Sequence, residues 1–194
     1  MFAFTKFYAV TLNKQKLAAM SHIKLLLLLT SLSCLSLHCK KESELDKLPP
    51  ATAIGANTFG CLLNGKAWPI GAKGDHMTEV HYSKGILSVR YATRLDPFSS
   101  ITNESVTLRT NKIHEYGSYF ISYNDINEDF FSVGINGNIY SSAFNNTNGF
   151  AFINISRLDS INHYVSGTFE FSLNDFNNSS KIKVSSGRFD FRYQ

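Results

Sequence analysis

The sequence predicts an all-β fold, an antiparallel β-sandwich or barrel-like domain of about eight to ten strands. Three observations support this prediction. From Asn57 onward, apolar and polar residues alternate with a period of two, turn-forming residues recur at regular intervals, and no long window shows helical periodicity. We expect this β domain to cover residues 57–194. A signal-peptide helix over residues 1–38 and a flexible tether over residues 39–56 are expected to precede it.

The domain is expected to open with a β-hairpin. Two β-prone runs, Thr58–Leu63 and Lys66–Ile70, flank the pair Asn64-Gly65. Asn-Gly favours a type I′ turn, because both central residues of that turn need a positive φ. We expect Trp68 to fill the core, and Pro69 to end the second strand or to mark a sheet edge.

Further strands are expected along the rest of the chain, separated by loops rich in Asn, Asp, Ser and Gly. In the final strands every second residue is aromatic or aliphatic, which places those side chains on one face, toward the core. The expected strands are Glu79–Tyr82, Gly85–Thr93, Glu104–Thr110, Ser118–Tyr123, Asn138–Phe144, Gly149–Arg157, Tyr164–Asn174 and Lys181–Tyr193.

The N-terminal segment has the pattern of an export signal. Met20–Lys24 is short and basic, and the apolar run Leu25–Leu37 follows it. As a helix this run is about 20 Å long, shorter than a bilayer core of about 30 Å. A basic start and a short apolar run before a cleavage point are typical of a secretory signal. Residues 1–19 add nothing to this pattern, so we expect Met20 to be the true start.

Cys39 is the predicted lipid attachment site. The stretch Leu37-His38-Cys39-Lys40-Lys41, followed by acidic residues, resembles the cleavage region of Bacteroidota lipoproteins. The resemblance implies cleavage before Cys39, acylation of its thiol and attachment to the outer membrane, at the periplasmic face or the cell surface. Ser36 and His38 depart from the usual pattern, and Cys34 is the alternative lipidation site. An ordinary signal peptide that releases a soluble domain is the other alternative.

Composition distinguishes the tether from the domain. Lys40–Ala56 begins with charged residues, contains Pro49-Pro50 and ends in small residues, a composition that does not order itself. Fully extended, it reaches roughly 50–60 Å. The four lysines before Cys39 account for the whole net charge of +4, so the remaining chain is neutral. A neutral chain without a basic stripe has no electrostatic footprint for nucleic acid.

Three segments of the domain carry a second resemblance: Phe59–Trp68, Val165–Phe171 and Ser186–Asp190. Together they are similar to a group of Bacteroidota lipoproteins whose β-rich domain has no assigned function. The resemblance implies a β fold and a cell-envelope setting. It implies no catalytic residues.

Polar residues offer few candidates for a metal site. His76 and His81 lie five apart, so on one strand they face opposite sides. His114-Glu115 lacks the second histidine of a zinc-protease motif. Two sets have oxygen or nitrogen ligands at suitable spacing: Asp75, Glu79 and His81, and Asp125, Asn127 and Asp129. A solvated strand edge explains the first set, and an acidic turn explains the second, because the glycine and the bidentate glutamate of a calcium loop are missing. We expect no metal and no cofactor.

Other side chains have both a structural and a functional interpretation. Cys61 is either a small buried side chain or, near a cation, a reactive thiol. Asp159-Ser160-Ile161 resembles the site at which Bacteroidota O-glycosylate proteins, which makes Ser160 a modification candidate. The tyrosines either fill the sheets or form a stacking surface for sugars or peptides; they are Tyr82, Tyr91, Tyr116, Tyr119, Tyr123, Tyr140 and Tyr164.

These observations favour a bacterial cell-envelope lipoprotein with a non-catalytic β domain that binds a ligand or partner, a protein or a glycan. The chain contains neither a nucleophile elbow nor a phosphate loop nor a paired-cysteine metal signature. The alternative is a small envelope hydrolase or carbohydrate-active protein with a site built from loops. A third possibility is a structural envelope component.

Overall fold

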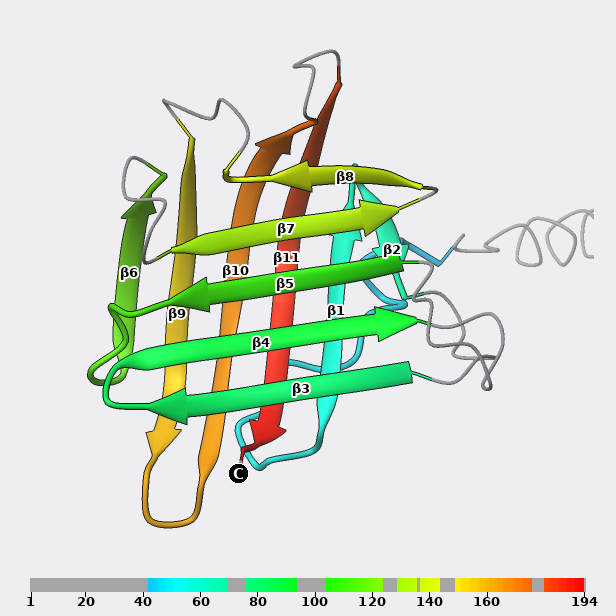
Figure 1. The fold of residues 1–194 in the computed structure, drawn as a ribbon. Coiled ribbons are helices and arrows are strands. Elements are labelled where there is room, and N and C mark those ends of the chain that lie inside the picture. The colour runs from blue at the N-terminus through cyan, green and yellow to red at the C-terminus, as the bar shows by residue number, and fades with distance from the viewer. Residues whose placement is uncertain are drawn as a thin grey trace, which may run out of the picture. The chain divides into compact units, whose positions relative to one another are not determined.

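In the computed structural model, the chain from Glu42 onward forms one compact unit built of two antiparallel β-sheets (Figure 1). The structure describes residues 42–69, 76–93, 104–123, 129–135, 137–143, 149–175 and 180–193. Within these ranges the strands are β1 (Thr58–Leu63), β2 (Lys66–Trp68), β3 (His76–Ser83), β4 (Ile86–Thr93), β5 (Glu104–Thr110), β6 (Gly117–Ser122), β7 (Phe130–Ile135), β8 (Asn138–Ser141), β9 (Phe150–Asp159), β10 (Tyr164–Asn174) and β11 (Lys181–Arg192).

The two sheets form a sandwich, which confirms the all-β prediction and decides between its two alternatives. Sheet A has the order β2-β1-β11-β10-β9-β6, and sheet B the order β3-β4-β5-β7-β8. The strands of one sheet run across those of the other (Figure 1). The first strand, β1, pairs with the last, β11, so the two ends of the domain lie together in the middle of sheet A.

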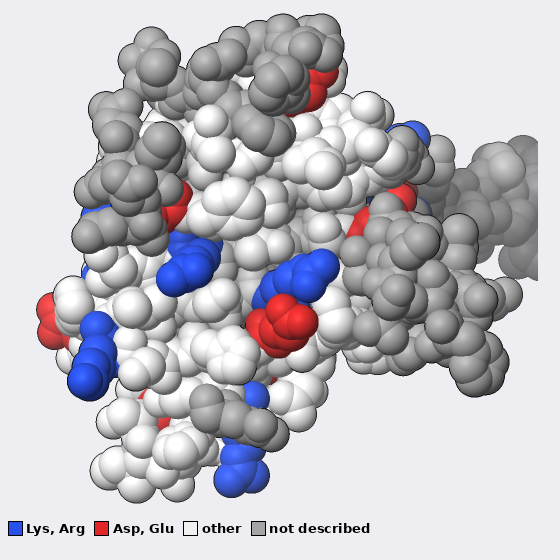
Figure 2. Space-filling model, in the orientation of Figure 1, with Lys and Arg blue, Asp and Glu red and all other residues white. Residues whose placement is uncertain are grey.

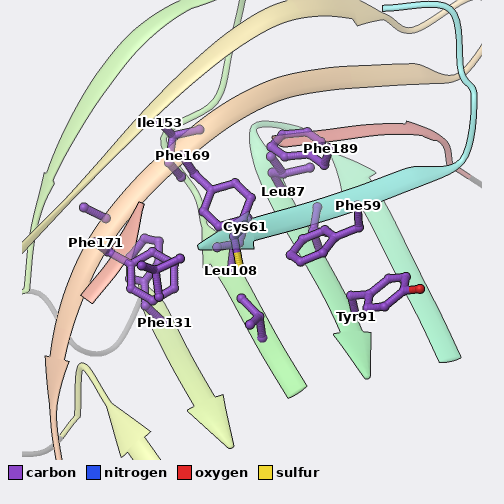
Figure 3. Close-up of a cluster of buried hydrophobic side chains, with 14 of the residues drawn as sticks. Phe59, Cys61, Leu87, Tyr91, Leu108, Phe131, Ile153, Phe169, Phe171 and Phe189 are labelled. Atoms are coloured by element: carbon purple, nitrogen blue, oxygen red, sulfur yellow. The ribbon is translucent and has the colours of Figure 1, made fainter. Parts of the chain in front are cut away.

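Alternating side chains from both sheets fill the space between them, as the period of two predicts. Phe169 and Phe171 on β10 are buried, and so are Phe189 and Phe191 on β11. Figure 3 shows the sheet A aromatics facing side chains of sheet B, including Leu87, Leu108 and Phe131. The core is filled by apolar side chains without disulfides among the described residues.

The predicted first hairpin is present. Asn64 and Gly65 both have positive φ, 48° and 81°, as a type I′ turn requires. Trp68 is buried in the core, and its indole Nε1–H donates a 2.6 Å hydrogen bond to Glu104 Oε2. Strand β2 ends there, immediately before Pro69, as expected.

Sequence reasoning missed strand β7. The run Phe130–Ile135 pairs with β5 and β8 and buries Phe131 and Val133 in the core. Its alternation is short, and the acidic residues before it directed the interpretation toward a turn. Strand β8 ends at Ser141, three residues before the predicted end of that strand.

Residues 42–56 differ from the expected flexible tether, because they lie on sheet A and are hydrogen-bonded to it. We call this segment the arm. It begins with a turn in which Ser43 and Asp46 exchange hydrogen bonds, each backbone N–H donating to the other's side chain. Leu48 is then buried, with its side chain close to Gly60 of β1. The prediction for residues 42–56 failed because the groups that order the arm lie far away in the sequence.

Strands at the C-terminal end of the chain supply those groups. Arg188 Nη1 donates to the Pro49 carbonyl at 2.9 Å, and Arg157 Nη1 donates to the Ala53 carbonyl at 2.8 Å. At Gly60 a Cβ atom would come within 2.6 Å of Pro49 Cδ, so the absence of a side chain lets the arm lie flat on β1. Charge and proline in the arm therefore do not prevent its order.

The predicted signal segment, with Met20, Cys34 and Cys39, lies outside the described residues. Within those residues, no helix has the length and apolar character needed to cross a bilayer.

Candidate binding surface

The outer face of sheet A is divided into a covered half and a bare half. The arm lies over β1 and β11 and reaches one end of β10 and β9 through Gly55 and Ala53, whereas β6 and the other end of β9 carry three outward-facing phenylalanines. Phe120, Phe150 and Phe152 are 67%, 52% and 40% exposed. We call these three side chains the phenylalanine surface. Exposed aromatic side chains that adjoin one another mark an interaction site more strongly than scattered ones do.

The strand register explains why the three rings gather. Phe120 lies opposite Phe152 and Ser122 opposite Phe150 in the antiparallel pair of β6 and β9, so these side chains share one face. The rings of Phe120 and Phe150 stack with centroids 4.8 Å apart. The opposite side of β9 buries Ala151 and Ile153, so the two faces of this strand alternate with a period of two.

Few polar groups border the phenylalanine surface. Ser118 Oγ and Asn154 Oδ1 lie at one end and are hydrogen-bonded to each other at 3.0 Å. Glu170 lies opposite Phe152 on β10, and its Oε1 accepts a hydrogen bond from the Ser186 backbone N–H. Ser122 lies opposite Phe150 on the same face and is also exposed, so the surface combines apolar rings with a short polar border.

Strand β6 is also an open edge of sheet A among the described strands. It contains neither proline nor a charged residue, the features by which edge strands usually avoid pairing. The opposite edge, β2, has three residues, and the Ala67 N–H there donates to Glu44 Oε2 of the arm at 2.9 Å. One edge of the sheet is thus blocked by the arm, whereas the β6 edge, beside the phenylalanine surface, has no further strand partner among the described residues.

A cleft of about 400 Å³ lies between edge strand β3 and the end of β11. Its lining residues are Asn57, His76, Thr78, Glu79, Val80, His81, Phe191 and Arg192. The cleft does not direct its polar groups to one point. His76 faces the core side and stacks on Tyr91 with centroids 5.5 Å apart, and Glu79 on the outer side is paired with Arg90.

The two histidines of β3 therefore face opposite sides, as their spacing predicts. Asp75, the third member of that predicted set, lies outside the described residues. On the sandwich face drawn in Figure 2, charged side chains are scattered and no patch of one sign is visible.

Sequence reasoning missed the buried carboxylate of Asp190. Alternation places Asp190 on the outer face of β11, yet it is 1% exposed because the arm covers it. Its oxygens accept hydrogen bonds from Ser166 Oγ, Thr52 Oγ1 and the backbone N–H groups of Ile54, Gly55 and Ala56, at 2.6 to 3.1 Å. Burial raises the pKa of Asp190, but these hydrogen bonds outweigh it and hold that pKa well below its usual range.

The predicted calcium set is only partly described, since Asp125 and Asn127 fall outside the described ranges. Asp129 is buried, and its Oδ2 accepts a 2.7 Å hydrogen bond from Lys112 Nζ, which makes it half of an ion pair. Within the part of the chain that the structure describes, no three His, Cys, Asp or Glu residues gather in a way that would hold a metal ion.

Cys61 and Ser160 lie in contrasting environments. Cys61 is fully buried at the centre of the sandwich, and burial raises the pKa of its thiol. Of its two interpretations, a small buried side chain is therefore the correct one. Ser160 is exposed in the turn between β9 and β10. That turn is fixed by Asp159, whose carboxylate accepts hydrogen bonds from the N–H groups of Ile161 and Asn162.

Most of the seven tyrosines fill the sheets, which is the first of their two interpretations. Tyr91 and Tyr123 are buried, and Tyr82, Tyr119 and Tyr140 pack against the core. Tyr116 is exposed before β6, and the half-buried Tyr164 ring lies under the Arg157 guanidinium at 4.6 Å. Phenylalanines, not tyrosines, form the exposed aromatic surface.

No family model, curated protein or solved structure matches this chain. The fold and the surface define the class of the molecule: a β-sandwich with a filled core, a docked N-terminal arm and an exposed phenylalanine surface next to an open strand edge.

Proposed function

We propose that this protein is a bacterial cell-envelope lipoprotein, acylated on Cys39, whose β-sandwich is a non-catalytic binding domain. The observation that carries the proposal is the phenylalanine surface, which contributes little to the core and lies on the half of sheet A that the arm leaves bare. The basic and apolar leader before Cys39 supports the envelope setting.

The chemistry of the surface favours a protein partner over a glycan. Sugar hydroxyls require many hydrogen bonds, and the polar side chains Ser118 and Asn154 beside the rings already bond to each other. An apolar side chain from a partner strand needs no such groups. Its backbone would pair with the free edge of β6, an arrangement known as β-augmentation.

Lipidation is tested by palmitate labelling and intact mass of the wild type beside the Cys39→Ala and Cys34→Ala variants. The proposal predicts loss of label in Cys39→Ala alone. Loss of label only in Cys34→Ala would move the anchor to Cys34. A wild type that carries no label would refute the lipoprotein assignment.

Binding is tested by placing a photo-crosslinking residue at position 120 in cells and comparing it with the same residue at Ile161, which is exposed on a turn. The proposal predicts a discrete cross-linked species from position 120 that is lost when Phe150 and Phe152 are replaced by serine. The same unspecific pattern from both positions would contradict it.

The alternative, an envelope hydrolase, would have its site in the cleft beside β3, whose two imidazoles face opposite sides of the strand. A hydrolase with its site there would lose activity on envelope glycans or esters in the His76→Ala variant. The binding proposal predicts that this variant still forms the cross-link at position 120.

A further inference from the structure

The arm changes the distance between the lipid and the domain. The first described residue of the compact unit is Glu42, and hydrogen bonds join the arm to sheet A at positions from Glu44 to Ala56. Only Lys40 and Lys41 separate Cys39 from Glu42. Three residue steps reach at most about 10 Å, against roughly 50–60 Å for a free tether of seventeen residues.

We propose that the β2 edge of sheet A, together with the arm turn Ser43–Lys47, is held against the lipid headgroups, so that the bilayer is the partner of this end of the domain. This inference rests on the proposed acylation of Cys39. The turn is fixed to the edge, because Glu44 accepts a hydrogen bond from the Ala67 N–H of β2. The lipid therefore holds a folded domain rather than the end of a loose chain.

The surface at this end is compatible with a membrane interface. Leu45 is 47% exposed and lies in the sequence between the two members of the turn's ion pair, Glu44 and Lys47. Lys66 of β2 is also exposed, and its charge acts on Glu44 of the turn. The same turn carries Glu44 and Asp46 beside Lys47, so the exposed Leu45, and not a net charge, is the group that suits the boundary between headgroups and acyl chains.

The placement also orients the phenylalanine surface. Strands β2 and β6 are the two edges of a six-stranded sheet, so five strand spacings separate them (Figure 1). At about 4.8 Å per spacing, β6 lies roughly 24 Å from the β2 edge. A domain fixed at β2 presents β6 and its phenylalanines on the side away from the anchor.

Site-directed fluorescence tests the inference with the full acylated protein. A cysteine at position 45 or at position 116 is labelled with an environment-sensitive dye; Cys61 is buried and stays unlabelled. Tyr116 is the control because it is 75% exposed and precedes β6. The labelled proteins are reconstituted in vesicles of phosphatidylethanolamine and phosphatidylglycerol that contain a headgroup nitroxide quencher.

We expect several-fold stronger quenching at Leu45→Cys than at Tyr116→Cys. Equal quenching at the two positions, or none at position 45, overturns the inference. Mass spectrometry of the same samples separates the two proposals: acylated protein without the contrast contradicts only the membrane placement, whereas protein without acyl chains contradicts both.

A second variant tests whether the short connection is the cause. A flexible Gly/Ser insert of about twenty residues between Lys41 and Glu42 has an r.m.s. length of roughly 25 Å. It leaves the arm and the acylation site intact, so we expect Cys39 to stay acylated while quenching at position 45 falls toward that at position 116. Quenching that persists at position 45 would overturn the role of the short connection.

Discussion

The Thr52 hydroxyl donates a 2.6 Å hydrogen bond to Asp190 Oδ2, joining the arm to the last strand of the domain across 138 residues of chain. Ser166 Oγ reaches the other oxygen of the same carboxylate at 2.6 Å. A single buried charge thus satisfies two hydroxyls and the backbone N–H groups of a segment that has no strand partner of its own.

Replacing Asp190 should release the arm and destabilise the domain. In Asp190→Ala the donors of the arm lose a charged acceptor, and a loss of about 2–4 kcal/mol in the free energy of unfolding follows from leaving several of them unpaired. Urea unfolding measures the loss, and limited proteolysis locates new cleavage between Pro49 and Ala56. Ser166→Ala removes one of the hydrogen bonds and should cost about 1 kcal/mol without freeing the arm. Equal proteolysis of both variants would contradict this role for Asp190.

The same carboxylate should make stability depend on pH. The pKa of Asp190 is lower in the folded domain than in the unfolded chain, where it is about 3.9. Its contribution is therefore complete above the unfolded value and is lost as the pH falls through the folded value. We expect the stability difference between wild type and Asp190→Asn to be largest near neutral pH and to shrink below about pH 4. A difference that stays constant into the acid range would show that Asp190 is not charged in the folded domain.

Gly60→Ala should displace the arm without altering the sheet pairing. The added Cβ would lie 2.6 Å from Pro49 Cδ, and overpacking of this kind typically costs about 1–3 kcal/mol. Faster proteolysis of the arm and a lower urea midpoint are the expected results. Gly65→Ala is the matched control. It strains the turn at φ 81° but meets no neighbouring atom, so its stability should fall while the arm stays protected.

The phenylalanine surface should be dispensable for folding. Replacing the exposed Phe120 and Phe150 by serine should change the free energy of unfolding by about 1 kcal/mol or less, most of it from the lost ring stacking. The buried Phe169→Ala variant, by contrast, should lose about 3–5 kcal/mol. Urea titration compares the two, and binding of an apolar dye to the native protein should fall only in the serine variant. Similar destabilisation in both would mean that the exposed rings belong to the core.

Cys61 should react only when the domain opens. Its thiol is fully buried, and burial raises its pKa, which leaves little thiolate at neutral pH. We expect a thiol reagent to label it at the rate of unfolding, and promptly in denaturant. A Leu45→Cys thiol in the same protein should react at once, which serves as the control. Prompt labelling of Cys61 in the native protein would contradict the filled core.

The period of two was sufficient to predict the all-β fold because it depends on each strand alone, but the choice between a sandwich and a barrel depends on how the sheets pack. It assigned Phe169 and Phe171 to the core, and the Asn64-Gly65 turn followed from backbone preference alone. Strand β7 was missed because its short alternation directly follows an acidic stretch that resembled a turn.

The candidate site was less predictable because it depends on contacts between distant segments. Alternation alone places Asp190 on the solvent-facing side of β11, and it is buried only because the arm covers it. The order of the arm depends in turn on distant partners such as Arg157 and Arg188. The phenylalanine surface was also hidden, since Phe120 joins Phe150 only through the register of β6 with β9. Alternation shows that a ring faces outward, but it does not show which strand lies next to it.

The pairing of β1 with β11 fixes when folding can finish. The first strand pairs early with β2, but its other side and most of the arm find their hydrogen-bonding partners in strands made near the end of the chain. Pairings of such long sequence separation close slowly, because the loop entropy must be lost before the contacts form. A polypeptide threaded across a membrane from its N-terminus would therefore stay without its central pairing until the last dozen residues emerge. The full pairing of sheet A therefore waits for the last residues of the chain, whether they leave a ribosome or a membrane channel.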